Sequence, residues 1–272
     1  MLYAEQSRLQ RVRPVSPMSC DSPPASPWIA RPRKRPEASF RLFCFPRAGG
    51  GVASFRNWPE DCHPEIEVAL VQPPGRENRV RETPLHTMES LVSSICDAIP
   101  GFLDRPYALF GHSLGAKVAF ETSRELRRRG LPEPACFFAA ASAGPAVPWT
   151  RPLLHSLGDL ELLQEIQRRY GGVPEVILAD RELWPFLVPA LRADITILET
   201  YRYAENPQLA CPITCFCGTG DAMTPEAEAA EWRKQTSAEF RLHMLSGDHF
   251  FPLQERPQIL KQIAADLSLR DN

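Results

Sequence analysis

The chain has 272 residues and a hydrophobic fraction of 43%, which is enough for one large α/β domain or two small ones. Its formal charge of −2 and its isoelectric point near 6.3 give no electrostatic support for nucleic-acid binding. No apolar run approaches the roughly 18 residues of a membrane-spanning helix, and the N-terminus lacks the pattern of a secretory signal. We therefore expect a cytoplasmic protein that does not bind membranes.

The chain contains eight cysteines, and four of them lie inside apolar runs that are typical of strands: Cys44, Cys136, Cys215 and Cys217. Without a secretory signal, buried free thiols are expected rather than disulfides. The spacing of Cys211, Cys215 and Cys217 does not match a zinc site, and no fourth ligand lies near them in the sequence. We expect neither a metal nor a cofactor.

Residues 1–36 contain seven prolines, six arginines and five serines but few large apolar residues. Such a segment cannot bury enough surface to offset the entropy lost on ordering. We expect a disordered extension here. The folded domain is then expected to cover 37–272.

The first predicted strand, 40–45, runs into a glycine-rich loop at 46–51. Such a loop after an early strand can supply a backbone donor to an oxyanion, because glycine lets the backbone N–H approach a ligand closely. An ordinary glycine-rich turn is the alternative interpretation. The loop is not a phosphate-binding P-loop, because it lacks the Lys-Ser/Thr ending.

Strands and helices alternate through the first half of the chain, which predicts an α/β fold with a mostly parallel sheet and helices on both faces. Further strands are predicted at 66–71, 107–110 and 135–141, and helices at 88–102 and 114–129.

The turn between the predicted strand 107–110 and the helix that follows it carries the motif G-x-S-x-G, from Gly111 to Gly115, with Ser113 at its centre. A strand, a sharp turn and a helix are the context that a nucleophile elbow requires. Small residues two positions before and after the serine relieve the crowding of the turn. We expect Ser113 to be a nucleophile, the alternative being a serine that caps a helix.

Residues 152–203 interrupt the alternation and contain no clear strand. Two helical stretches rich in Leu, Ile and aromatic residues are predicted, at 153–169 and 181–200. An insertion at this point in a hydrolase sheet usually forms a lid over the active site. Surface helices without such a role are the alternative.

The base and the acid are expected at the ends of the last two strands, 212–217 and 240–245. His249 follows the final strand in a loop, and the fold requires the order serine, acid, histidine along the chain. The acid is then Asp221, because Asp248 would rarely reach the ring of its own neighbour. His249 takes the proton of Ser113 in this scheme, and backbone N–H groups of Leu114 and Ala48 hold the oxyanion.

Several stretches together resemble the type II thioesterases, the free-standing editing enzymes of polyketide and nonribosomal peptide synthases, which are related to the medium-chain thioesterase of mammalian fatty-acid synthase. The matching stretches, in order, are 43–51 with Phe55 and Trp58, 74–79, 110–116, 170–174, 191–194 and 249–251. The resemblance covers residues 39–268.

This resemblance implies an α/β-hydrolase fold with a helical lid, and hydrolysis of acyl groups carried on the phosphopantetheine of an acyl or peptidyl carrier protein. It also implies Ser113, Asp221 and His249 as the triad and Ala48 and Leu114 as oxyanion donors. A medium-chain fatty-acyl carrier thioesterase, a carboxylesterase or acyltransferase, and a non-catalytic partner of carrier proteins are the alternatives. We expect a monomer.

Three positions depart from the family pattern: Arg47, Pro73 and Asp248. Arg47 replaces a common histidine or aromatic residue beside the expected entrance. We expect that its guanidinium could contact the phosphate of phosphopantetheine.

Overall fold

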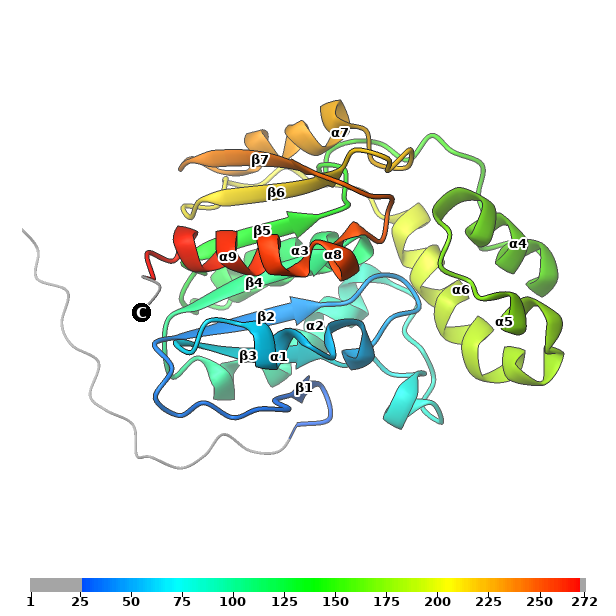
Figure 1. Cartoon of the computed structure of the whole chain (residues 1–272), viewed down its shortest axis with the longest axis horizontal. Coiled ribbons are helices and arrows are strands. Elements are labelled where there is room, and N and C mark those ends of the chain that lie inside the picture. The colour runs from blue at the N-terminus through cyan, green and yellow to red at the C-terminus, as the bar shows by residue number, and fades with distance from the viewer. Residues whose placement is uncertain (1–25, 270–272) are drawn as a thin grey trace, which may run out of the picture.

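A computed structural model describes residues 26–269, which fold around a seven-stranded sheet (Figure 1). The strand order is β1-β3-β2-β4-β5-β6-β7; β1 pairs antiparallel with β3, and the other neighbours are parallel. The strands are β1 Ile29–Ala30, β2 Phe40–Phe45, β3 Ile66–Val71, β4 Tyr107–His112, β5 Cys136–Ala140, β6 Ile213–Gly218 and β7 Phe240–Leu245. The predicted α/β class with a mostly parallel sheet is confirmed.

Helices cover both faces of the sheet because side chains alternate across each strand. In β2, Phe43 and Phe45 pack in one apolar cluster, whereas Leu42 and Cys44 pack in another. Figure 1 shows α2 and α3 behind the sheet and α1, α8 and α9 in front of it. These helices are α1 Trp58–Asp61, α2 Met88–Ala98, α3 Leu114–Arg128, α8 Phe251–Gln254 and α9 Arg256–Asp266, and α7 Glu226–Ala230 lies beside β6.

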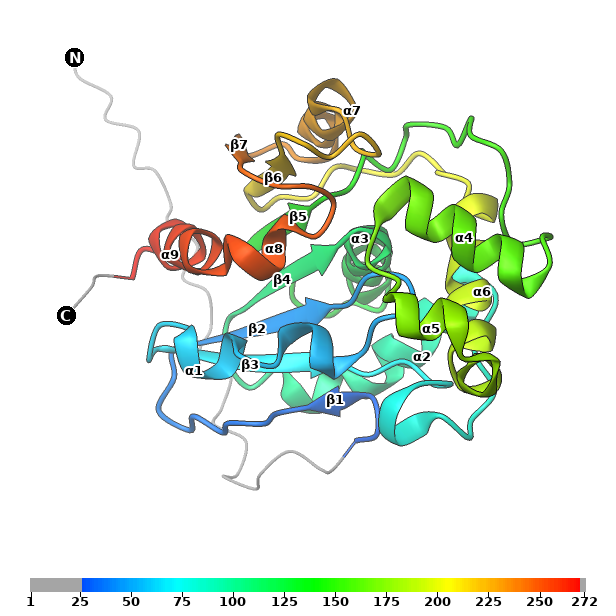
Figure 2. The same ribbon diagram turned by 45° about the vertical axis from the view of Figure 1, so that its right-hand side comes forward.

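The lid region packs at the carboxyl ends of the strands around a third apolar cluster (Figure 2). Its helices are α4 Asp159–Tyr170, α5 Glu175–Ala179 and α6 Trp184–Thr200. The prediction that a helix begins at residue 153 was wrong, because α4 begins at Asp159. The segment before α4 is instead tied to α6, since the backbone N–H groups of Leu154 and His155 donate to the buried carboxylate of Glu199 at 2.7 and 3.1 Å.

The expected start of the folded region was also wrong. Residues 26–36 belong to the fold, since β1 pairs with β3 and Ile29 is buried. Arg35 fixes the segment that follows by donating to four backbone carbonyls at 2.6–3.0 Å, those of Pro59, Cys62, His63 and Ile66. Residues 1–25, the rest of the expected extension, lie outside the described residues.

Cysteines in the described range are all free and buried. Between residues 26 and 269, no group of three or more His, Cys, Asp or Glu side chains could hold a metal ion. The same range includes no helix with the length and apolarity needed to cross a membrane.

Candidate active site

The turn between β4 and α3 places Ser113 in a strained backbone conformation, with φ 57° and ψ −119°. A β-carbon at Gly111 would overlap the backbone of Ala116, and one at Gly115 would overlap the carbonyl oxygen of Phe45. Both glycines are therefore required by close backbone approach. The side chain of Ser113 is held at the carboxyl end of the sheet, as in a nucleophile elbow.

Three side chains that the sequence analysis singled out lie in one hydrogen-bonded row. His249 Nε2 is 2.9 Å from Ser113 Oγ, and His249 Nδ1 is 2.8 Å from Asp221 Oδ2. All three residues are buried, with exposed fractions of 9%, 6% and 6% for Ser113, Asp221 and His249. With a proton on Nδ1, the imidazole donates to the carboxylate and can accept the proton of the serine hydroxyl.

The carboxylate of Asp221 is fixed by further donors. Burial opposes its charge, but the hydrogen bond and charge of His249, the backbone N–H of Met223 and the side chain of Thr224 together lower its pKa. The N–H of Met223 donates to Oδ1 at 2.9 Å. Asp221 is consequently ionised at neutral pH. The alternative acid, Asp248, is exposed and accepts instead from the backbone N–H of Phe250.

His112 has a structural role that the sequence analysis missed. Its Nε2 lies 3.0 Å from the carbonyl oxygen of His249, and its side chain is buried. Burial, with the nearby charge of His249, lowers the pKa of His112 to about 3. The neutral ring therefore donates from Nε2 and holds the backbone of the His249 loop. Its position beside Ser113 in the motif was the available signal.

The glycine-rich loop begins against the elbow, since a β-carbon at Gly115 would also overlap the carbonyl oxygen of Pro46. In residues 26–269, the backbone N–H groups of Ala48 and Leu114 have no hydrogen-bond acceptor. Gly49 takes a positive φ of 71°. Free N–H groups beside a nucleophile can bind an oxyanion.

A buried ion pair between distant segments supports this loop. Asp194 of α6 accepts a hydrogen bond from Gly49 N at 2.7 Å and pairs with Arg76, whose Nη2 is 3.0 Å from Oδ1. Arg76 also donates to the carbonyl of Gly50 at 3.0 Å. The sequence analysis found both segments only as matched stretches and assigned no contact between them.

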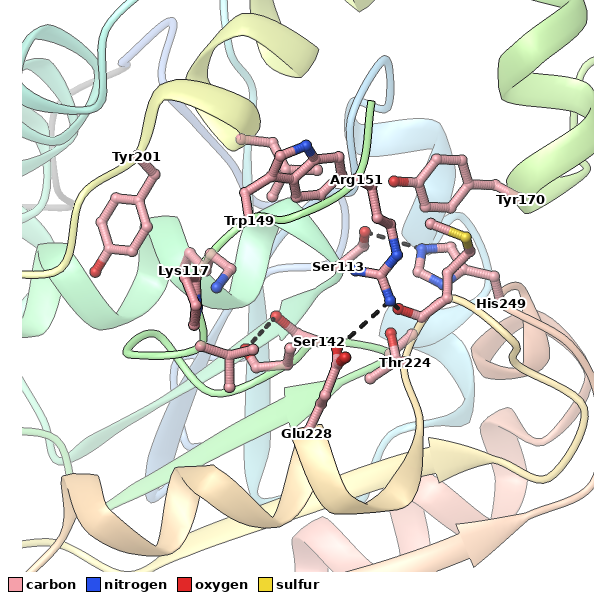
Figure 3. A pocket seen from close by; sticks show the side chains of 16 residues that line it. Ser113, Lys117, Ser142, Trp149, Arg151, Tyr170, Tyr201, Thr224, Glu228 and His249 are labelled. Carbon is pink, nitrogen blue, oxygen red and sulfur yellow. Dashed lines mark hydrogen bonds and ion pairs between the residues drawn. The ribbon is translucent and has the colours of Figure 1, made fainter. Parts of the chain in front are cut away.

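Two cavities meet at Ser113, and both include Tyr170 and His249 in their walls. The larger cavity has a volume of about 370 Å³ and is mainly apolar. Arg47 forms part of its wall, and its guanidinium lies 4.8 Å from the ring centre of Phe250. Its apolar wall comes from the lid: Leu163, Ile166, Val173, Ile177, Leu187, Leu191 and Ile195. The smaller cavity, of about 60 Å³, has several charged side chains in its wall (Figure 3).

The Thioesterase domain family matches residues 40–267 of this chain. The gramicidin S biosynthesis protein GrsT of Aneurinibacillus migulanus is 35% identical over 242 residues, which are 89% of this chain and 94% of GrsT. Thioesterase PikA5 of Streptomyces venezuelae is 38% identical over 241 residues, 88% of this chain and 85% of PikA5.

Among solved structures, the type II thioesterase BorB from the borrelidin biosynthetic cluster superimposes with a TM-score of 0.82 at 34% identity, over 89% of this chain and 98% of BorB. The helical insertion over the elbow and the sheet order described above are therefore those of an α/β-hydrolase fold of this kind. The chain belongs to the thioesterase family, among the type II thioesterases, and is a thioester hydrolase.

Proposed function

We propose that this protein removes acyl groups from the phosphopantetheine arm of acyl or peptidyl carrier proteins, and so edits misloaded polyketide or nonribosomal peptide synthases. The observation that supports this most is the buried row Asp221, His249 and Ser113, which opens on an apolar cavity large enough for an acyl chain. The relatives' roles in gramicidin S and borrelidin biosynthesis favour the same substrate class. Such carriers are cytoplasmic, and so is the proposed place of action.

The proposed reaction has two halves. In the first half, Ser113 Oγ attacks the thioester carbonyl while His249 takes its proton. The C–S bond then breaks, and His249 returns the proton to the leaving pantetheine thiolate. In the second half, water attacks the acyl-serine ester and gives its proton to His249, which returns it to Ser113 as the acid leaves. Asp221 stays ionised and stabilises the imidazolium.

The oxyanion formed in each half is proposed to bind the free N–H groups of Ala48 and Leu114. Leu114 begins α3, so the positive end of the helix dipole lies at the same place. Loss of one such donor typically costs about 10²- to 10³-fold in kcat.

One comparison tests the proposal: hydrolysis of an acyl-carrier protein, the corresponding acyl-pantetheine and a p-nitrophenyl ester by wild type, Ser113→Ala and Ser246→Ala. Ser246 is exposed near the end of β7 and serves as the matched control. We expect both thioesters to be hydrolysed, with loss of activity only in Ser113→Ala. Ester turnover without thioester turnover would indicate a carboxylesterase, and activity in Ser113→Ala would contradict the mechanism.

The length of the preferred acyl group separates editing from fatty-acid release. An editing enzyme should hydrolyse short acyl groups on a synthase carrier at least as well as medium-chain ones. A strong preference for medium-chain acyl carrier protein would support the fatty-acyl thioesterase instead.

Arg47 is proposed to contact the phosphate of the arm. Its side chain donates to its own loop at the carbonyl of Ala48 and stacks on Phe250, which places its charge at the larger cavity. We expect Arg47→Ala to raise KM for the acyl-carrier protein about tenfold and to leave p-nitrophenyl ester hydrolysis within about twofold. If turnover of the carrier-bound substrate is unchanged, this contact does not contribute.

A further inference from the structure

The smaller cavity at Ser113 differs from the larger one in chemistry. Its wall includes Lys117, Arg151 and Glu228, together with the hydroxyl groups of Ser142 and Thr224 (Figure 3). The larger cavity is lined mainly by apolar lid residues, with the guanidinium of Arg47 in its wall beside Phe250. An acyl group on Ser113 therefore has two different environments within reach.

Lys117 is a buried cation with few partners. It lies about one helical turn after Ser113 on α3, and its exposed fraction is 7%. Its Nζ donates to the carbonyl of Gly144 at 3.3 Å and lies 5.4 Å from the ring centre of Tyr201. An ammonium group has three N–H donors. An anion in the cavity would give Lys117 a counterion and offset the cost of its burial.

The two carboxylates that act electrostatically on Lys117, Glu228 and Glu121, already pair with arginines. Glu228 of α7 lies 3.5 Å from Arg151, and Glu121 of α3 lies 2.8 Å from Arg124. Neither carboxylate lies within ion-pair distance of Lys117 in the described part of the chain. The positive charge of Lys117 therefore has no dedicated counterion among residues 26–269.

The size of the cavity limits its occupant. About 60 Å³ holds roughly four water molecules. That is close to the size of a carboxymethyl group, the part of a malonyl thioester beyond its carbonyl carbon. A medium-length alkyl chain would fit only in the larger cavity.

We propose that the cavity at Lys117 is a second acyl site of this enzyme, which binds short acyl groups bearing a carboxylate one carbon beyond the thioester carbonyl. The proposal rests on the proposed function, since the acyl group reaches the cavity through Ser113. Apolar acyl chains occupy the larger cavity. The enzyme thus sorts acyl groups by charge between two cavities that meet at one nucleophile.

The test compares malonyl-pantetheine with isovaleryl-pantetheine, which has nearly the same shape but no charge, and uses octanoyl-pantetheine for the larger cavity. The variants are Lys117→Met, which keeps the length of the side chain, and Lys261→Met, an exposed lysine on α9. Thermal unfolding checks that each variant is folded.

We expect Lys117→Met to lower kcat/KM for malonyl-pantetheine by about 10- to 100-fold, because the free energy of a hydrogen bond to a charged group corresponds to a factor of this size. Isovaleryl and octanoyl turnover should change less than about twofold, and Lys261→Met should resemble wild type. An equal loss for all three thioesters would assign the cavity to the pantetheine arm and overturn the proposal, as would no loss for malonyl.

A second measurement needs no variant. Burial lowers the pKa of Lys117 to about 8, although Glu228 and Glu121 raise it. Burial raises the pKa of Tyr201, so that its ring stays neutral, and the arginines stay charged. Lys117 loses its charge as the pH rises through about 8, while the malonyl carboxylate stays ionised. The ratio of malonyl to isovaleryl kcat/KM in wild type should therefore fall between about pH 7 and 9, and a constant ratio would contradict the proposal.

Binding measurements distinguish a failure of this inference from a failure of the proposed function. If wild type hydrolyses none of the three thioesters, thioesterase activity itself fails. Calorimetry with Ser113→Ala then still compares the affinities of malonyl- and isovaleryl-pantetheine. Tighter binding of malonyl-pantetheine that disappears in the double variant with Lys117→Met supports the site, and equal affinities refute it.

Discussion

The hydrogen bond between Asp221 and His249 decides which nitrogen of the imidazole carries the proton. Asp221→Asn keeps the size of the side chain but removes its charge, and the amide can force the wrong tautomer. We expect kcat to fall by about 10⁴-fold with little change in stability. Asp248→Asn, next to His249 but exposed, should stay near wild type in the same steady-state assay. Comparable losses in both variants would contradict the assignment of the acid.

We expect His112 to act on the reaction through the backbone of His249, as a positioning residue. His112→Ala removes the donor to the His249 carbonyl, and we expect kcat to fall about 10- to 100-fold while KM is nearly unchanged. His112→Gln retains an N–H donor and should recover part of the loss. A wild-type kcat in His112→Ala would show that the loop holds its place without this bond.

At the scale of elements, the contact between α6 and the glycine-rich loop carries the next prediction. Asp194→Asn leaves the buried Arg76 without its counterion, which should lower the free energy of unfolding by about 3–5 kcal/mol. kcat should fall as well, since Gly49 adjoins Ala48. Urea denaturation and steady-state kinetics measure the two effects.

Asp159→Asn is the control for this prediction, because Asp159 forms a more exposed lid ion pair with Arg192. Its cost should stay below about 1 kcal/mol. Equal losses of unfolding free energy in the two variants would mean that burial of Asp194 does not increase the contribution of its ion pair to stability.

Local sequence patterns predicted those elements that depend on neighbouring residues alone. The elbow was predictable because its strand, its glycines and its helix are contiguous. The path of the segment before α4 was not, because it depends on Glu199, 45 residues beyond Leu154. The pair of Arg76 and Asp194 was missed for the same reason, since 118 residues separate the partners.

At the scale of the whole molecule, Glu67 joins the N-terminal segment to the sheet. It is buried, pairs with the buried Arg41, and accepts from Arg31 and from the backbone N–H of Arg35. Glu67→Ala should lower the free energy of unfolding by about 3–5 kcal/mol, because among residues 26–269 Arg41 then keeps only the more exposed Asp104 as a counterion.

Glu239→Ala provides the comparison for Glu67→Ala, since this exposed carboxylate pairs with Arg241 at the surface. Its effect in chemical denaturation should be within about 1 kcal/mol. The composition of residues 1–36 concealed the ordered part of the segment, because its anchors are a two-residue strand and arginine contacts with distant carbonyls rather than a repeating apolar pattern.

The hydrogen bond from Gly49 to Asp194 makes the lid and the glycine-rich loop thermodynamically linked. A displacement of α6 breaks this bond, so an enzyme with a withdrawn lid holds its loop less firmly. By reciprocity, an acyl chain that fills the larger cavity and steadies α6 also steadies the loop. Occupancy of the cavity thus prepares the site for attack, and the Gly49 amide should exchange its hydrogen more slowly when an acyl ligand is bound.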